Sequence, residues 1–209
     1  MTDTARQASS SDAAPRRSRT QVWILIGVFF GPLLVAFALY YGAPMLGFDW
    51  RPEGTTNRGE LIHPAKPLPT VEVATVAGTP LKAETLHGKW NVFYVGDGQC
   101  DARCRDALIL MRQTRLALND DMTRVQRIFL TTGNCCDDQY LATEHPGLII
   151  AKADDAAGQQ LISAFPDANQ GRIYIVDPLG NLMMSYPADA PRKGLLEDLK
   201  KLLKLSHIG

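Results

Sequence analysis

The segment that decides the fold is KWNVFYVGDGQCDARC, residues 89–104. Its first half is apolar and rich in aromatic and β-branched side chains, which favours a buried strand over Lys89–Val95. Turn residues with two glycines follow, and after them the apolar residues recur at the helical period. The segment therefore predicts a strand, a loop and a helix, with Asp101 as the helix N-cap and with Cys100 and Cys104 at the junction.

The spacing of the two cysteines at this junction is compatible with a disulfide or a shared metal ion. A thiolate near a helix N-terminus is favoured by the positive end of the helix dipole. With Cys104 in the first turn and Cys100 in the loop before it, the side chains can meet in a disulfide or bind one metal ion. The alternative is two unrelated cysteines, one of them buried as a small hydrophobe.

Length, charge and cysteine count limit the class of protein. The chain has 209 residues, enough for one ordinary domain with appendages, and its formal net charge is zero. No basic excess points to nucleic acid, so we expect no nucleic-acid partner. Four cysteines are too few for a disulfide scaffold in a chain of this length, and they indicate a site plus a remainder.

An apolar run near the N-terminus predicts a membrane anchor. Residues 1–20 are rich in Ser, Thr, Ala and Arg without an apolar period, which predicts a disordered tail. VWILIGVFFGPLLVAFALYY (22–41) has no charge and is long enough to cross a hydrocarbon layer of roughly 30 Å. We therefore predict a transmembrane helix over 21–43, in contact with membrane lipid through 22–41. The arginines precede the span, which places the tail in the cytoplasm and the rest outside.

A cleaved signal peptide is the competing interpretation of this run. Ala36-Phe37-Ala38 has the small-x-small form that signal peptidase accepts. The bulky residues that follow, beginning with Leu39, argue against cleavage. The favoured prediction is a single-pass protein of a bacterial inner membrane, with its N-terminus inside and its globular domain in the periplasm.

The remaining chain divides into a linker and one domain. Residues 44–69 combine glycine, proline and polar side chains without a period, which predicts a tether. Residues 70–209 then predict an α/β domain, because the strand at 89–95, its helix and a second apolar strand at 125–131 form a parallel βαβ unit. The later elements are a short strand, a helix, a hairpin around a proline-glycine turn and a last helix. They are expected at 148–150, 154–165, 173–186 and from Pro191 on.

This order of elements, with a cysteine pair where the first central strand meets its helix, resembles the thioredoxin-like fold. The Cys-x-x-x-Cys spacing, Gly88-Lys89 before the strand, the VDPLGNL hairpin and the anchor resemble the Sco/SenC family more closely than thioredoxins, whose pair is Cys-x-x-Cys. Members of that family are membrane-tethered and assist copper-site assembly in cytochrome c oxidase. The resemblance implies a respiratory oxidase subunit, or another assembly factor, as the partner.

The copper-binding pattern of that family is incomplete in this chain. Its members bind copper through the two cysteines and a later histidine just before the hairpin. The cysteines correspond to Cys100 and Cys104, but Asn169 stands at the place of the histidine, and an amide is a poor copper ligand. Substitute ligands are sought in Cys135, Cys136 and His145, although each of these has an ordinary structural interpretation.

The adjacent Cys135 and Cys136 follow the second predicted strand, at the sheet edge where the first pair is expected. Neighbouring cysteines do not easily form a relaxed disulfide with each other, so we expect idle thiols, pairing with another thiol or binding of a soft metal.

The cysteine pair together with the family resemblance implies three functions. The preferred one is a thiol:disulfide protein for oxidase assembly, in which Cys100, the solvent-facing member, attacks a partner disulfide and Cys104 resolves the mixed disulfide. The second is a copper chaperone that holds Cu(I) between the same cysteines. The third is an assembly scaffold without catalysis.

Overall fold

The structure is a computed structural model that describes residues 17–42, 56–133, 135–136, 138–187, 190–206 and 208. It divides into two compact units, Met1–Gly54 and Thr55–Gly209. Each unit is described by itself.

The first unit contains one long helix, α1 (Arg17–Gly42). Its stretch Arg19–Gly42 has the length and composition to cross a membrane, since 24 residues span about 36 Å at 1.5 Å per residue. The large apolar side chains of α1 are exposed, as expected for a helix whose partner is lipid. The helix begins at Arg17, whereas the sequence predicted a span of 21–43. Residues 1–16 of the predicted tail, residue 43 at the end of the predicted span and residues 44–55 of the predicted tether lie outside the described residues.

The second unit is built on a six-stranded sheet with the order β1-β6-β5-β2-β3-β4. Strands β2, β3 and β4 are parallel, and β5, β6 and β1 continue the sheet antiparallel from β2. The predicted βαβ unit is therefore confirmed. The strand bounds are β1 Glu60–Pro67, β2 Trp90–Asp97, β3 Val125–Thr132, β4 Leu148–Lys152, β5 Ile173–Val176 and β6 Asn181–Tyr186.

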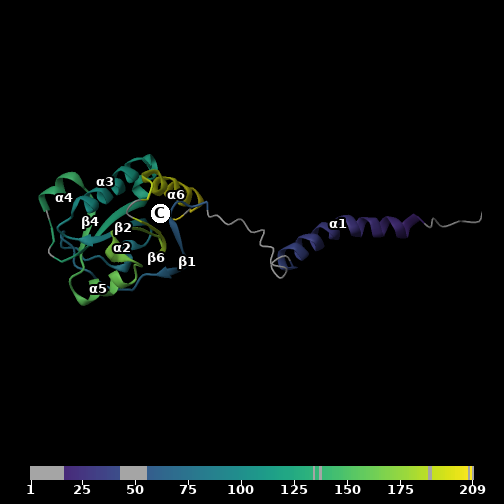
Figure 1. Ribbon diagram of the computed structural model, residues 1–209, viewed down its shortest axis with the longest axis horizontal. Coiled ribbons are helices and arrows are strands. Elements are labelled where there is room, and N and C mark those ends of the chain that lie inside the picture. The colour runs from purple at the N-terminus through teal and green to yellow at the C-terminus, as the bar shows by residue number, and fades with distance from the viewer. Residues whose placement is uncertain are drawn as a thin grey trace, which may run out of the picture. The chain divides into compact units, whose positions relative to one another are not determined.

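Helices cover both faces of the sheet (Figure 1). One core cluster lies between the sheet and α3 and α6, and a second lies on the opposite face with residues of α2 and α5. Strand β2 contributes alternate side chains to both, with Val92 in the first cluster and Phe93 in the second. The helix bounds are α2 Ala83–Leu86, α3 Ala102–Leu116, α4 Asp138–Glu144, α5 Ala156–Ser163 and α6 Arg192–Leu205, with 3₁₀ turns η2 Asn119–Arg124 and η3 Ala168–Gln170.

The sheet includes a strand that the sequence analysis assigned to the tether. Residues 60–67 form β1, which pairs antiparallel with β6 through Glu60–Ser185 and Lys66–Leu182. Almost all of its residues are exposed, because β1 is an edge strand that contacts the rest of the domain on one side only. Exposure removes the alternating pattern by which a strand is recognised, and the prolines at 64 and 67 are tolerated at an edge. The folded unit therefore starts before residue 70.

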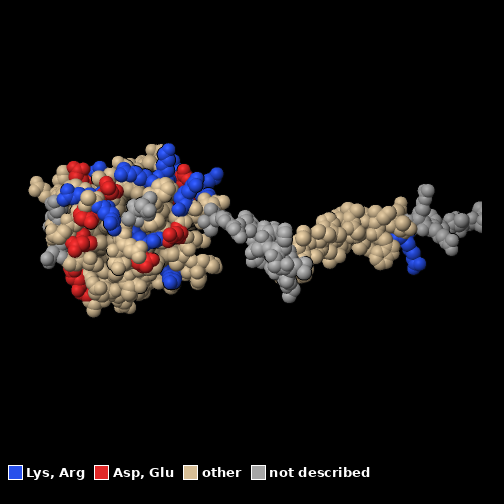
Figure 2. All heavy atoms as spheres, in the orientation of Figure 1, with Lys and Arg blue, Asp and Glu red and all other residues tan. Residues whose placement is uncertain are grey.

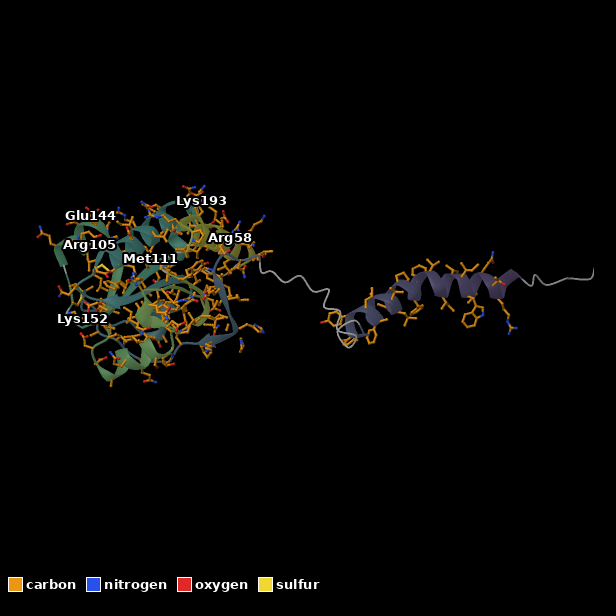
Figure 3. All side chains as sticks on the ribbon, in the orientation of Figure 1. Arg58, Arg105, Met111, Glu144, Lys152 and Lys193 are labelled. Atoms are coloured by element: carbon orange, nitrogen blue, oxygen red, sulfur yellow. A yellow bond between two sulfur atoms is a disulfide. The ribbon has the colours of Figure 1, made fainter. Side chains whose placement is uncertain are left out.

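A buried carboxylate fixes the segment that leads into β1. Asp198 of α6 is 2% exposed, and its Oδ2 accepts hydrogen bonds from the backbone N–H groups of Arg58 and Gly59, at 2.8 and 2.9 Å, and from the Tyr186 hydroxyl, at 2.9 Å. Three donors satisfy a buried charge that would otherwise be strongly unfavourable. Figure 3 shows Arg58 at the end of the domain where α6 lies, and this contact ties the chain entry to the last helix.

The surface of this unit carries both signs of charge. In the view of Figure 2, acidic and basic side chains are interspersed, with basic ones gathered over the α6 region. Helix α6 has exposed lysines, among them Lys193, Lys200 and Lys204.

Candidate thiol and disulfide site

The site is the turn between β2 and α3, at the carboxyl end of the parallel strands. Asp97 ends β2, its side chain accepts from the Gln99 N–H at 2.7 Å, and its carbonyl accepts from the Cys100 N–H at 3.1 Å. Cys100 has a φ of 47°, in the left-handed region that few non-glycine residues occupy. Asp101 caps α3 by accepting from the Cys104 N–H at 2.9 Å, so the predicted N-cap is confirmed.

Cys100 and Cys104 are joined in a disulfide, with their Cα atoms 5.0 Å apart. This separation is within the range that a disulfide needs, as the spacing predicted. The prediction that Cys100 faces solvent is wrong, because each cysteine is 2% exposed. The turn folds Cys100 back under the helix N-terminus, where both sulfur-bearing side chains belong to the α3-side core cluster. The catalytic roles of the two cysteines stay predictions.

A cavity of about 430 Å³ opens beside the disulfide. It brings together the cysteine turn, the end of β3 and the η3 turn, so that Asn169 lies in the same cavity as both cysteines. Sequence reasoning reached Asn169 only through the family resemblance, and the structure gives it a position at the site. The side chains that line the cavity include Tyr94, Asp97, Cys100, Arg103, Cys104, Thr132, Ile162 and Asn169.

Tyr94 is a buried tyrosine that lines this cavity, and the sequence analysis did not select it. It is 3% exposed, and burial, helped by the charge of Asp101 and opposed by that of Arg103, raises its pKa to about 12. The hydroxyl is therefore protonated at neutral pH and can donate a hydrogen bond into the cavity. Because Tyr94 stands in the apolar run of β2, its sequence context is that of an ordinary core residue and does not mark it as part of a site.

Arg105 braces the cysteine turn from the other side. Its Nε donates to the Cys100 carbonyl at 3.2 Å, and its guanidinium lies 4.8 Å from the centre of the Tyr140 ring. Figure 3 shows Arg105 on the side of the domain where α3 faces α4. A cation next to the cysteine pair favours the thiolate form after reduction. Its place one residue after Cys104 was a signal that sequence reasoning did not use.

His145 does not join the cysteines. It is 1% exposed, its Nε2 lies 3.3 Å from the Tyr140 hydroxyl, and it lines a separate apolar cavity under β4. Burial and the charges of Arg112 and Arg127 lower its pKa to about 4, so the ring is neutral at pH 7. Within the described part of the chain, no three side chains from His, Cys, Asp and Glu gather closely enough to hold a metal ion.

Cys135 and Cys136 are paired with each other in the structure, and both are half-buried. The sequence analysis expected them to stay idle, to pair with another thiol or to bind a metal, so this pairing corrects it. The physical reason is proximity, since the two cysteines are adjacent in the chain. Their use as copper ligands stays a prediction that this arrangement does not support.

Comparison with protein families identifies the domain. A family model described as "Transmembrane-like, thioredoxin-like, C-terminal domain" matches residues 90–206, more than half of the chain. The chain belongs to this family. The match runs from the start of β2 to the end of α6, and it therefore includes the whole cysteine site. No curated protein matches the sequence.

Solved structures show the same fold at low sequence identity. ScoI of Bradyrhizobium japonicum with copper bound is 18% identical with a TM-score of 0.51, covering 64% of this chain and 98% of that one. BsSco, described as a member of the Sco family of cytochrome c oxidase assembly proteins with a disulfide switch, is 13% identical with a TM-score of 0.53 and coverages of 70% and 99%. A thiol:disulfide interchange protein of Chlorobium tepidum is 15% identical with a TM-score of 0.55 and coverages of 68% and 99%. These likenesses establish a thioredoxin-like α/β fold for this transmembrane-like family member.

Proposed function

We propose that this chain is a membrane-anchored thiol:disulfide protein that assists assembly of the copper site of a respiratory cytochrome c oxidase. The observation that carries the proposal is the Cys100–Cys104 disulfide at the N-terminus of α3, beside a cavity at the carboxyl edge of the sheet. The likeness to BsSco and ScoI supports the link to oxidase assembly, and helix α1 supports the membrane anchor. The partner would be an oxidase subunit or another assembly factor in the periplasm.

The chemistry proceeds from the reduced pair. The Cys100 thiolate attacks one sulfur of a partner disulfide, and the electron pair of that bond leaves on the other partner sulfur, which takes up a proton. The Cys104 thiolate then attacks the mixed disulfide, releases the reduced partner and restores the Cys100–Cys104 bond. The helix N-terminus and Arg105 stabilise the thiolates, and the cavity admits the partner segment.

A trapping experiment tests this function. Full-length Cys104→Ser retains Cys100 but lacks the resolving thiol, so it should accumulate mixed disulfides with its partner, and Cys100→Ser should accumulate far fewer. Titration of the wild-type pair in glutathione buffers should give a single two-electron transition. A pair that stays oxidised or reduced across all buffers, with no trapped partner, would refute the redox function.

Copper as cargo is the second candidate. After reduction, Cys100 and Cys104 offer two soft sulfur donors that suit Cu(I), and ScoI structures hold copper. Asn169, at the place of the family's histidine, lies in the same cavity, but its amide is a poor donor for Cu(I). The donor set thus fits copper only in part. Stoichiometric copper on the reduced full chain, lost in Cys104→Ser and retained in Asn169→Ala, would favour this candidate over the redox function.

A further inference from the structure

The disulfide assigned to the proposed function is the less accessible of two sulfur pairs. Cys100 and Cys104 are each 2% exposed, whereas Cys135 and Cys136 are half-buried. A small thiol that regenerates the site must attack a sulfur atom directly, and access limits the rate of that attack. The more exposed pair therefore meets external thiols more readily than the buried one.

The segment that carries Cys135 and Cys136 is attached to the cysteine turn just before the pair. The Gly98 N–H of the turn donates to the Thr132 carbonyl at 3.0 Å, at the end of β3. At Gly133, a side-chain carbon would lie 3.6 Å from the carboxylate of Asp97, so this residue also lies against the turn. The residues shortly before Cys135 and Cys136, here called the vicinal pair, therefore lie beside the turn that contains Cys100.

A second attachment follows the pair. Tyr140 of α4 lies under the guanidinium of Arg105, which in turn donates to the Cys100 carbonyl. Thr132 and Gly133 before the two cysteines, and Tyr140 after them, therefore contact turn 97–105. Cys135 is three positions after Thr132 in the chain, a span of at most about 11 Å. Cys136 packs against the core cluster that also contains Cys100 and Cys104.

We propose that Cys135 and Cys136 form a second redox-active pair, which takes electrons from small external thiols and passes them to the buried Cys100–Cys104 disulfide. This inference rests on the proposed function, because it supplies the reduced state from which that function starts. It assigns the two sulfur pairs different tasks. Small thiols meet both pairs by free collision, which favours the more exposed vicinal pair, whereas a bound assembly partner holds its disulfide in the cavity beside the buried pair.

Bonds and electrons balance in the proposed transfer from external thiol to the buried disulfide. Two molecules of an external thiol such as glutathione reduce the Cys135–Cys136 bond and leave as one oxidised disulfide. A thiolate of the vicinal pair then attacks a sulfur of Cys100–Cys104, and that bond breaks with its electron pair on the leaving sulfur, which takes up a proton. The remaining vicinal thiolate attacks the mixed disulfide, so Cys135–Cys136 re-forms and Cys100 and Cys104 are released as thiols. Two electrons move and no further oxidant is needed.

The rate at which glutathione reduces the buried pair tests the relay. Oxidised full-length protein in detergent is mixed with reduced glutathione, quenched with acid, alkylated and mapped by mass spectrometry. In Cys135→Ser/Cys136→Ser, reduction of Cys100–Cys104 should be at least about fivefold slower, while its equilibrium reduction potential is unchanged. Equal rates in variant and wild type would overturn the relay. If Cys100–Cys104 is not reduced in either protein, the proposed function itself fails.

Cross-linking tests proximity without relying on that rate. Four double variants each keep one cysteine of each pair, for example Cys104→Ser/Cys136→Ser. At least one of them should form an intramolecular disulfide on mild oxidation. The control keeps Cys100 and adds Ser206→Cys, in a segment bonded to Arg124 at the opposite end of β3, with the other three cysteines changed to serine. If no double variant cross-links more than the control, the two pairs cannot exchange and the inference is refuted.

Discussion

Replacement of Asp198 by alanine should strongly destabilise the globular unit. The substitution removes the acceptor for the N–H groups of Arg58 and Gly59 and for the Tyr186 hydroxyl. The Arg58 N–H is partly exposed and can donate to water instead, but the Gly59 and Tyr186 donors are buried. A stranded buried donor costs about 1–3 kcal/mol, so we expect a loss of about 4 kcal/mol. That is a large fraction of the 5–15 kcal/mol by which domains are usually stable.

The measurement is urea unfolding of the full chain in detergent, followed by near-UV circular dichroism. The midpoint should fall while the slope stays constant, and the thermal midpoint should drop by roughly 12 °C at about 3 °C per kcal/mol. Glu197→Ala is the matched control, because Glu197 is the adjacent residue and also contacts Arg58, at 3.0 Å, but with side chains 52% and 64% exposed. It should cost about 0.5 kcal/mol. A loss below about 1 kcal/mol for Asp198→Ala would refute this reasoning.

The other predictions concern the site and its surroundings. Asn169→His adds an imidazole to the cavity that holds both cysteines, so reduced protein should bind Cu(I) at least about tenfold more tightly by competition titration, and an unchanged affinity would contradict the placement. Arg105→Met removes the cation that braces the turn, and alkylation of the reduced cysteine pair at pH 7 should slow about threefold, whereas Arg115→Met, at the far end of α3, should not change it. The pKa of His145 is lowered to about 4 in the folded state, so the unfolded chain takes up a proton first as the pH falls below about 6.5. Unfolding free energy should then drop by up to about 3 kcal/mol toward pH 4, and His145→Phe should flatten this dependence; parallel curves would exclude the effect. Gly158→Ala places a Cβ 2.2 Å from a neighbouring backbone Cα, and it should lower the unfolding free energy by about 3 kcal/mol in the same urea assay unless the helix can shift.

Three buried tyrosines should make the domain less stable at alkaline pH. Burial raises the pKa of Tyr94 and of Tyr174 to about 12, and burial with the Asp198 carboxylate holds that of Tyr186 still higher. In the unfolded chain these hydroxyls ionise near pH 10, so above that pH the unfolded state holds fewer protons and the folded state loses stability. Unfolding free energy should stay level from pH 7 to 9 and fall from about pH 10 to 12.

Local sequence determined the core of the fold and the centre of the site. The apolar run before Cys100, the capping aspartate at 101 and the helical period after it fix β2, the turn and α3 by interactions between near neighbours. The same holds for the hairpin of β5 and β6, where Asp177 accepts hydrogen bonds from the N–H groups of Leu179 and Asn181 inside the turn. The membrane-spanning character of α1 is evident from the length and apolar composition of the helix itself, without reference to other parts of the chain.

Tertiary structure alone decided the features that depend on distant parts of the chain. Strand β1 exists because β6 offers it a free edge between Asn181 and Tyr186, far along the chain, and the exposed residues of β1 show no alternation of apolar and polar side chains. The burial of Cys100, the separation of His145 from the cysteines and the presence of Asn169 in their cavity each follow from the packing of other elements around the turn. Spacing along a chain sets which neighbours can bond, but burial and long-range contact are set by the whole fold, because they depend on elements that the local sequence does not contain.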